Sequence, residues 1–450
     1  MPLTREDNDL LTRVGPETTM GKVLRRYWTP AFLLSDIPTA DCPPIGVTIL
    51  DEDFVAFRDS SGKVGFLDEL CCHRNASLTY GRVEEGGLRC LYHAWKFATD
   101  GTIMEAPNCD SMGILRQVKQ GSYPVREAGG LGWVYLGPPE FEPPFPTFPW
   151  MSSESSYDVN EAVLDCNWVQ LQEGSLDSSH LGLLHLDTVA GMRPGPRMVG
   201  SLYMSGEPWV EGGYGDSLGR GDGMPNTDDN NPPIYVEDTP FGFQYAAVRR
   251  THDATTKYVR ITAMAMPYTA HIGGSASGAI IVVPRTDTTS SFISARRLGE
   301  GVEPRVRPED EAPPSEAREH RFPQDGRKYT VPAQNRAAMA SKKSFAGFPG
   351  GNRPQDSAVQ GANSRNPIFP RTTEHLVGAD MAVLRFRSIL FENTARLEAG
   401  EPLLGLGEGY DFTQLQGHSG TVDVGAGWED LVPGNGVKGP LPVRQERVSV

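Results

Sequence analysis

The stretch CCHRNASLTYGRVEEGGLRCLYHAWKF, residues 71–97, contains two short loops that each carry one cysteine and one histidine. The first loop offers Cys71 and His73, and the second offers Cys90 and His93. Two thiolates and two imidazoles can complete a tetrahedral zinc site, although zinc ligands usually come as a cysteine pair followed by a histidine pair. One cysteine and one histidine in each loop also suit a [2Fe-2S] cluster in which one iron binds both thiolates and the other binds both imidazoles. The spacing therefore indicates a metal site of one of these two kinds.

The composition is that of a globular protein with an excess of acidic side chains. The chain has 450 residues, of which 38% are hydrophobic and 22% are charged, and its formal net charge is −15. A chain of this length exceeds a single hydrophobic core, so we expect two domains. The negative charge argues against sequence-independent binding to nucleic acid or to anionic membrane surfaces.

The sequence shows no signal for export or for membrane insertion. Its first residues, MPLTREDNDLLTRVG, are charged and lack the apolar segment of a signal peptide. No run approaches the ~20 apolar residues that a membrane span needs. We therefore expect a cytoplasmic protein whose six cysteines are thiols or metal ligands and not a disulfide framework.

Hydrophobic patterning in the first part of the chain predicts helix followed by short strands. Residues 1–30 have helical periodicity with a break at Gly15-Pro16, and residues 48–137 contain short strands separated by turns. The segment GPPEFEPPFPTFPW, residues 137–150, is too rich in proline for a regular sheet strand. We place the domain boundary there, which gives domains of residues 1–150 and 151–450.

The second part predicts a mixture of helices, strands and long loops. Residues 166–187 have a helical pattern, and residues 241–298 contain four strands. A long helix is expected from about Ala379. Residues 188–232 and 299–335 are expected to be loops because they are rich in glycine, proline or charge.

The predicted helix at the start of the second domain carries a second group of candidate ligands. Glu173, Asp177 and His180 have the i, i+4, i+7 spacing of one helix face. His185 lies about 140° away on an ideal helix, so both histidines can reach one metal only if the helix bends, and Gly182 is a suitable place. Two histidines on a half-apolar helix can also be ordinary core residues.

Both groups of residues resemble those of the Rieske non-heme iron aromatic ring-hydroxylating oxygenases, in the group that includes phthalate dioxygenase. His73-Arg74 and the sequence YHAWKF are similar to Rieske loops, with Cys72 in place of the usual proline and Ala94 in place of the usual glycine. Of the two neighbouring cysteines, only Cys71 keeps the C-x-H spacing. The resemblance implies that Cys71, His73, Cys90 and His93 bind a [2Fe-2S] cluster.

The sequence NW…EGSLDSSHLGLLH is similar to the mononuclear-iron helix of the same family. By this resemblance His180 and His185 are iron ligands, and Asp177 is the acidic residue that links the two metal centres. Two histidines need a carboxylate to complete a facial triad for Fe(II). The sequence PQDSAVQ, residues 354–360, resembles the region that supplies this carboxylate, and it points to Asp356. Asp380 is the alternative, but it is better explained as the start of a helix.

The resemblance extends over nearly the whole chain and implies a fold and an assembly. The implied fold is α+β, with an N-terminal antiparallel β Rieske domain and a catalytic domain whose curved antiparallel sheet wraps over helices, a helix-grip arrangement. The implied assembly is a homotrimer, or a dimer of trimers, in which the cluster of one subunit faces the mononuclear iron of the next. A separate NAD(P)H-dependent reductase with a flavin and an iron-sulfur centre would supply electrons, and the chain itself has no G-x-G-x-x-G nucleotide unit.

The resemblance implies an oxygenase that uses O2 to dihydroxylate or mono-oxygenate a small aromatic substrate. A phthalate-type carboxylate is the expected substrate, because Arg249-Arg250 could bind a carboxylate through paired hydrogen bonds. The same arginines could instead be a solvated strand end. The alternative activity is the O- or N-dealkylation of an aromatic ether or amine. An electron-carrier protein and a zinc-stabilised binding module are the rival classes, and the long chain after the cluster loops argues against the carrier.

Overall fold

The computed structural model describes residues 2–110, 112–115, 117–152, 157–185, 197–199, 202–204, 229, 231–251, 255–274, 277–297, 321–341, 343–362 and 364–432. Most of the expected loop 188–232 and residues 299–320 of the expected loop 299–335 lie outside this set. Among the residues that the structure describes, no helix is both long and apolar enough to cross a membrane.

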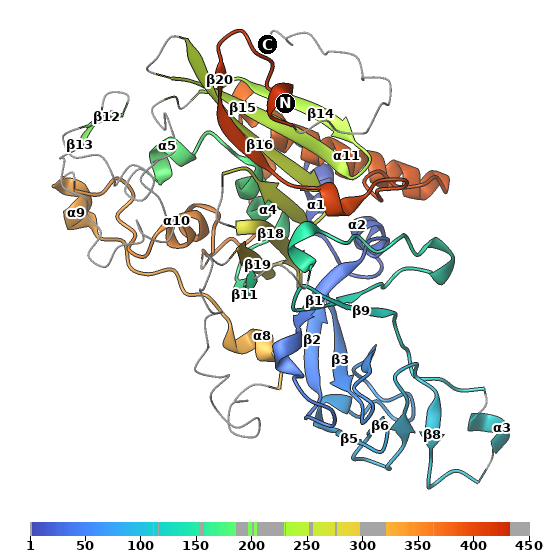
Figure 1. Ribbon diagram of the computed structural model, residues 1–450. Helices are drawn as coiled ribbons and strands as arrows, with labels where there is room; N and C mark the ends of the chain where they lie inside the picture. The colour runs from blue at the N-terminus through green and yellow to red at the C-terminus, as the bar shows by residue number, and fades with distance from the viewer. Residues whose placement is uncertain are drawn as a thin grey trace.

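The N-terminal part consists of small antiparallel sheets (Figure 1). One sheet has the strand order β1-β10-β9, a second has β2-β3-β4, and a third has β5-β6-β7-β8. The strands are β1 Thr29–Leu33, β2 Ile45–Ile49, β3 Glu52–Arg58, β4 Val64–Asp68, β5 Arg82–Glu84, β6 Gly87–Arg89, β7 Lys96–Phe97, β8 Ile103–Glu105, β9 Val125–Ala128 and β10 Leu131–Val134. The third sheet carries the second cysteine–histidine loop between β6 and β7, at the end of the molecule farthest from the large sheet.

The C-terminal part is built on an antiparallel sheet with the strand order β11-β19-β18-β17-β16-β15-β14, with β20 also paired to β16. Its strands are β11 Tyr157–Leu164, β14 Ile234–Thr239, β15 Gly242–Arg250, β16 Thr256–Ala265, β17 Thr269–Ile272, β18 Ser277–Pro284, β19 Ser290–Arg297 and β20 His418–Asp423. A separate hairpin joins β12 Arg197–Val199 and β13 Leu202–Met204. The sequence pattern predicted β15, β16, β18 and β19, but it missed β11, β14 and β17 and the short β20, which lies in a glycine-rich segment. The hairpin β12–β13 corrects the expectation that residues 188–232 form only loops.

The helices among the described residues are α1 Arg5–Thr12, α2 Thr19–Leu24, α3 Met112–Leu115, α4 Trp168–Leu176, α5 Leu181–Leu184, α8 Pro323–Gly326, α9 Arg336–Ala340, α10 Asn352–Val359 and α11 Met381–Ala399. Helix α4 contacts β18 and β19, and α11 contacts β14, β15 and α4 (Figure 1). The helical region predicted at residues 1–30, with its break at Gly15-Pro16, is two short helices on either side of that break, followed by β1, and α1 and α2 pack on α11. Antiparallel sheets with packed helices confirm the α+β fold class.

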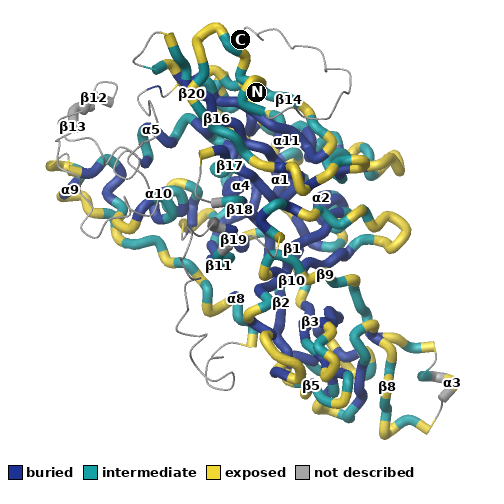
Figure 2. The backbone as a smooth tube through the Cα atoms, viewed as in Figure 1, coloured by how far each residue is buried: buried dark blue, intermediate teal, exposed yellow. Residues whose placement is uncertain are grey.

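One apolar core continues through both parts of the chain (Figure 2). Trp133 of β10 and Phe32 of β1 belong to the same cluster of buried side chains as Trp168 of α4 and Phe386 of α11. The proline-rich segment contributes Phe148 and Trp150 to it. A second, smaller core lies beneath the cysteine–histidine loops and includes Phe57, Leu78, Leu88 and Phe97. The loops therefore have a packed base of their own.

Glu173 on α4 is held by two buried arginines. Its carboxylate accepts hydrogen bonds from Arg371 at 3.0 and 3.1 Å and from Nε of Arg387 at 2.7 Å. Arg371 also donates to Asn8 of α1, and Arg387 pairs with Glu374. Burial raises the pKa of Glu173, but the charges of Arg371 and Arg387 outweigh burial and hold the pKa below its ordinary value. The network joins α1, α4 and α11 through charges that satisfy one another.

Glu173→Gln is expected to lower the free energy of unfolding by about 3 kcal/mol, because removing one partner leaves buried guanidinium groups without compensation. Urea denaturation followed by circular dichroism measures this difference. The pKa of Glu173 is depressed in the folded protein, so its contribution is present above the ordinary value of 4.5 and is lost as the pH falls through the lower folded value. The difference between parent and variant should therefore shrink below pH 4.5.

Glu392→Gln provides the matched control. Glu392 pairs with Arg385, but its side chain is 42% exposed. This change should alter stability by less than about 1 kcal/mol. Equal destabilisation by the two variants would show that the buried network has no special role.

Candidate metal centres

The first cysteine–histidine loop closes on itself through backbone hydrogen bonds. The N–H of Cys71 donates to the carbonyl of Ala76 at 2.9 Å, and the N–H of Asn75 donates to the carbonyl of Cys71 at 2.8 Å. Asn75 has a φ of 55°, in the left-handed region that asparagine tolerates better than most residues. The result is a tight turn that brings the residues after Cys71 back beside it.

The second loop repeats this geometry at the matching positions. The N–H of Cys90 donates to the carbonyl of Trp95 at 2.8 Å, and the N–H of Ala94 donates to the carbonyl of Cys90 at 3.1 Å. Ala94 has a φ of 60° and occupies the position that Asn75 occupies in the first loop. The left-handed backbone explains why glycine is the usual residue at this place in related loops. The two loops are therefore structurally equivalent, as the spacing predicted.

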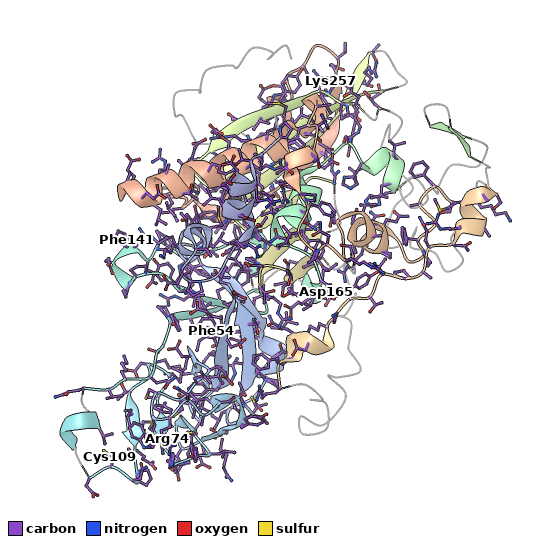
Figure 3. The ribbon with its side chains drawn as sticks, turned by 180° about the vertical axis from the view of Figure 1, so that it is seen from behind. Phe54, Arg74, Cys109, Phe141, Asp165 and Lys257 are labelled. Carbon is purple, nitrogen blue, oxygen red and sulfur yellow. The ribbon has the colours of Figure 1, made fainter. Side chains whose placement is uncertain are left out.

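The side chains of the two loops gather at the outer end of the N-terminal part, where Figure 3 labels Arg74. The thiols of Cys71 and Cys90 are buried, whereas His73 and His93 are half-buried with ring centroids 4.6 Å apart. The ring of His73 stacks on Trp95. Two buried thiols below two outward imidazoles are the donor set of a cluster with one sulfur-bound and one nitrogen-bound iron.

Cys71 and Cys72 occupy different environments. The side chain of Cys72 is exposed, and its backbone N–H donates to Oε1 of Gln120 at 2.7 Å. Cys71 is buried, and burial raises the pKa of its thiol to about 12. A thiol with such a pKa stays protonated at neutral pH unless a metal ion replaces the proton. The geometry therefore fits Cys71, and not Cys72, as the metal ligand.

The helix predicted over residues 166–187 is not continuous, because it is interrupted after Leu176. Helix α4 ends at Leu176, and Asp177 has extended backbone angles. Oδ1 of Asp177 accepts hydrogen bonds from the N–H of Ser179 at 2.7 Å and from its hydroxyl at 2.8 Å. This side-chain turn competes with the helix for the backbone. The break thus falls at Asp177 and not at Gly182, and Asp177 and His180 do not share a helix face with Glu173.

The turn and a second helix bring His180, His185 and Asp356 together. His180 and His185 flank the one-turn helix α5, and their ring centroids are 5.0 Å apart. Oδ1 of Asp356, on α10, lies 3.0 Å from Nε2 of His185 and 3.6 Å from Nε2 of His180. One ligand atom of each residue lies within 4.8 Å of the others. Asp380 lies outside this group, at the N-terminus of α11, where its carboxylate accepts a hydrogen bond from the N–H of Val377.

The outer nitrogens of both histidines contact side chains that accept hydrogen bonds. Nδ1 of His180 lies 3.3 Å from Oδ2 of Asp177. Nδ1 of His185 lies 2.7 Å from Oε1 of Gln355. The sequence analysis missed Gln355, since a buried glutamine carries no signal of its own beyond its position beside Asp356. Both rings are thus held from the side opposite Asp356.

Charge and burial set the protonation of Asp177 and His180. Burial raises the pKa of Asp177, but the hydrogen bond from His180 and those from Ser179 lower it to about 2. Burial lowers the pKa of His180, but its hydrogen bond to Asp177 and the charge of Asp356 outweigh burial, and the pKa is raised above its ordinary value. Asp177 is therefore an anion at neutral pH. Two carboxylates that attract positive charge, those of Asp177 and Asp356, therefore lie beside His180.

The two predicted substrate-binding arginines point to opposite faces of β15, because consecutive strand residues alternate. Arg250 is exposed and pairs with Asp229. Arg249 is buried and donates to the carbonyl of Ser178 at 2.5 Å and to its hydroxyl at 3.1 Å. Its Nη1 is buried and has no hydrogen-bond partner among the described residues. The two arginines cannot form one clamp, and only Arg249 faces the turn that carries Asp177.

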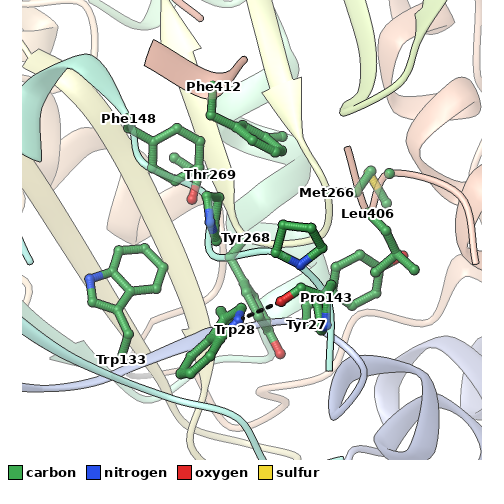
Figure 4. A pocket seen from close by; sticks show the side chains of 14 residues that line it. Tyr27, Trp28, Trp133, Pro143, Phe148, Met266, Tyr268, Thr269, Leu406 and Phe412 are labelled. Atoms are coloured by element: carbon green, nitrogen blue, oxygen red, sulfur yellow. Dashed lines mark hydrogen bonds between the residues drawn. The ribbon is translucent and has the colours of Figure 1, made fainter. Parts of the chain in front are cut away.

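An apolar cavity lies apart from these centres, between the two parts of the chain (Figure 4). Its described lining consists of Tyr27, Trp28, Trp133, Pro143, Pro144, Pro146, Phe148, Ala265, Met266, Tyr268, Thr269, Gly405, Leu406 and Phe412. Trp28 donates to the carbonyl of Pro143 at its edge. These side chains offer no carboxylate, imidazole or thiol, so the described lining lacks the usual metal-binding groups.

Two family descriptions match most of the chain. "Rieske [2Fe-2S] domain" matches residues 27–124, and "LigXa C-terminal domain like" matches residues 134–435. The oxygenase subunit of phthalate 4,5-dioxygenase from Pseudomonas putida is 34% identical over 95% of this chain and 94% of its own length. The oxygenase subunit of 5,5'-dehydrodivanillate O-demethylase from Sphingobium sp. (strain NBRC 103272 / SYK-6) is 37% identical over 51% of this chain and 54% of its own length.

Solved structures share the fold at low sequence identity. An NdmA QL mutant from Pseudomonas putida CBB5 with theobromine has a TM-score of 0.55 at 17% identity, over 85% of this chain and 94% of that chain. Dicamba monooxygenase bound to dicamba has a TM-score of 0.52 at 17% identity, over 84% of this chain and 99% of that chain. These similarities support the arrangement of the two parts described above.

Cys71→Ser should abolish the visible absorption of a [2Fe-2S] cluster, whereas Cys72→Ser should retain it. The physical reason is that the buried Cys71 thiol faces Cys90, while Cys72 points into solvent. Visible absorption and iron and sulfide content of the purified variants provide the measurement. Loss of the cluster in Cys72→Ser with retention in Cys71→Ser would reverse the assignment.

Proposed function

Because this chain belongs to the Rieske non-heme iron oxygenase family, we propose that it is the terminal oxygenase of a multicomponent system acting on a small aromatic carboxylate. Its reaction would use O2 and reductase-supplied electrons to dihydroxylate or mono-oxygenate that substrate. The observation that carries the proposal is the convergence of His180, His185 and Asp356 near the buried Arg249, whose Nη1 has no hydrogen-bond partner among the described residues.

The residues at the second centre fit a divalent metal ion. Oδ1 of Asp356 is buried and accepts no hydrogen bond from the described residues, although two imidazole nitrogens face it. An acceptor that faces two ring nitrogens in this way fits a cation bound by all three atoms. We assign His180, His185 and Asp356 as ligands of mononuclear Fe(II), which when bound supplies the activation of O2. Cys71, His73, Cys90 and His93 would hold the cluster that supplies electrons.

The chain's own side chains would bind and orient the substrate. Arg260, on the adjacent strand, is the direct cross-strand partner of residue 247. Residues 247 and 249 are two apart on β15 and share a face, so Arg249 and Arg260 lie on one face of the sheet. Arg260 is also buried, and its Nε donates to the carbonyl of Gly273. Burial lowers the pKa of Arg249, and the charge of Arg260 lowers it further. Two buried cations beside the metal centre would be stabilised by a substrate carboxylate, which a guanidinium binds well.

Dealkylation of an aromatic ether is the second candidate. It is favoured by the 37% identity to a protein named as an O-demethylase oxygenase subunit. Turnover of a panel of aromatic acids, aryl ethers and N-methyl compounds with a surrogate reductase, followed by mass spectrometry, separates the two. A cis-dihydrodiol indicates dihydroxylation, and formaldehyde release indicates demethylation. Turnover confined to neutral compounds would refute a carboxylate substrate.

The assembly is proposed to be a head-to-tail homotrimer, or a dimer of trimers, that receives electrons from a separate NAD(P)H-dependent reductase. Relatives named as oxygenase subunits support a separate electron-supplying component. Within one chain, the cysteine–histidine loops next to β6 lie far from α5 and α10 (Figure 1). A neighbouring subunit could place its loops beside Asp177, whose carboxylate already contacts the outer nitrogen of His180.

Asp356→Ala should remove mononuclear iron and oxygenation while leaving the cluster spectrum intact, because it deletes the only carboxylate of the ligand group. Iron content, visible absorption and product formation measure these three properties. Asp380→Ala is the control, since that carboxylate binds a backbone N–H at a helix start. Depletion of iron by Asp380→Ala in place of Asp356→Ala would contradict the assignment.

Asp177→Asn should keep both metal centres but slow electron transfer between them. The amide has the shape of the carboxylate without its charge, so it weakens a polar bridge between subunits. Rapid mixing of the reduced protein with O2 and substrate, in a single turnover, follows oxidation of the cluster. Cluster oxidation at the parental rate, or simple loss of mononuclear iron, would show that Asp177 has another role.

Arg249→Gln should lower kcat/KM for an aromatic carboxylate by about 30-fold, which corresponds to the ~2 kcal/mol of a hydrogen bond to a charged group. The matched control is Arg250→Gln, which makes the same chemical change at an exposed position on the opposite strand face. Steady-state kinetics of both variants provide the measurement. Equal effects of the two changes would indicate that charge alone matters and not contact with the substrate.

A further inference from the structure

Gln355 contacts one proposed iron ligand and precedes another in the chain. It lies on α10 directly before Asp356, and its side chain is fully buried. Oε1 of Gln355 lies 2.7 Å from Nδ1 of His185, while Oδ1 of Asp356 lies 3.0 Å from Nε2 of the same ring. Two consecutive residues of one helix therefore hold both nitrogens of His185.

We propose that Gln355 is a positioning residue that fixes the tautomer and the ring orientation of His185 for metal binding. An amide oxygen only accepts hydrogen bonds, so this contact keeps the ring proton on Nδ1. Nε2 then carries the lone pair, directed toward Asp356 and the metal position. The inference rests on the metal centre proposed above and adds a residue that does not touch the metal.

The reversed orientation of the amide is incompatible with this centre. If the amide nitrogen of Gln355 faced Nδ1, it would donate a hydrogen bond, and the ring proton of His185 would move to Nε2. That proton would then point at the cation position. In the orientation found here, Nε2 of Gln355 is buried without a hydrogen-bond partner in the described part of the chain. An unsatisfied buried amide costs about 1–3 kcal/mol, and the acceptor contact to His185 is nevertheless the one compatible with a cation at Nε2 of His185.

The side chains that contact the outer nitrogens of His180 and His185 differ in charge. Asp177 is the partner of His180, whereas the neutral Gln355 is the partner of His185. Asp177 and Asp356 together carry two negative charges, which balance one divalent cation. A third carboxylate at position 355 would add a negative charge beside the metal position and favour the ferric ion. Gln355 thus orients His185 without adding charge.

The test measures metal binding directly. Protein with an intact cluster and no mononuclear metal is titrated with Co(II), and its d–d absorption bands report coordination. Gln355→Met removes the acceptor at similar volume and should weaken Co(II) binding by about 10- to 100-fold. Gln355→Glu restores an acceptor, so it should bind Co(II) within a few-fold of the parent. In the iron-loaded protein it should also lower the Fe(III)/Fe(II) potential of the mononuclear centre, measured by EPR-monitored redox titration.

Gln170→Met is the control for a merely structural effect. Gln170 is also a buried glutamine, and it joins α4 to the segment after α10 by binding the carbonyl of Gln360 and the N–H of Phe369. This change should lower thermal stability without weakening Co(II) binding. If Gln355→Met weakens Co(II) binding no more than Gln170→Met, or if Gln355→Glu binds as weakly as Gln355→Met, the positioning role is wrong. Failure of the parent itself to bind Co(II) would instead refute the metal centre.

Discussion

The end of α4 at Leu176 is the constraint on which the metal-binding region depends. A continuous helix would separate the two histidines around its circumference, and no single metal could reach both. The carboxylate of Asp177 stops the helix by binding Ser179, and the following turn places His180 and His185 on either side of α5. One oxygen of Asp177 therefore shapes the backbone, while the other contacts an imidazole. The hydrogen bonds of the Asp177 side chain thus replace helical backbone bonds and set the positions of the two histidines. Asp356, on the distant helix α10, completes the group.

Buried charges fall into two groups that differ in how they are satisfied. Glu173 has two arginine partners at hydrogen-bond distance, and the network needs nothing from outside the chain. Asp356 and Arg249, by contrast, each keep a buried polar atom without a hydrogen-bond partner among the described residues. The first network stabilises the fold, whereas the polar atoms of Asp356 and Arg249 can be satisfied by the metal ion and substrate proposed above.

Sequence spacing could predict candidate ligands that lie close together in the chain, but it could not predict those that meet only after the chain folds. The two cysteine–histidine loops could be paired from spacing, because each loop is closed by its own hydrogen bonds. Helical periodicity also identified the region of α4, but it could not foresee the break at Asp177, where a side chain overrides the helix. No spacing rule links His185 to Asp356, so the family resemblance had to supply that residue. Gln355 had no signal at all, since its role follows from a contact made only after α10 packs.

The continuous core has a consequence for engineering. Aromatic side chains of the cluster-bearing part, such as Trp133 and Phe148, interlock with those of the catalytic part. A chimera that joins the N-terminal half of one homologue to the C-terminal half of another would therefore bring together two surfaces that evolved separately. Exchange of both outer loops together with their own packed base, which includes Phe57, Leu67 and Leu88, leaves the larger core intact. Electron-transfer modules of different potential are thus best transplanted with this base and both loops, and not at the proline-rich segment.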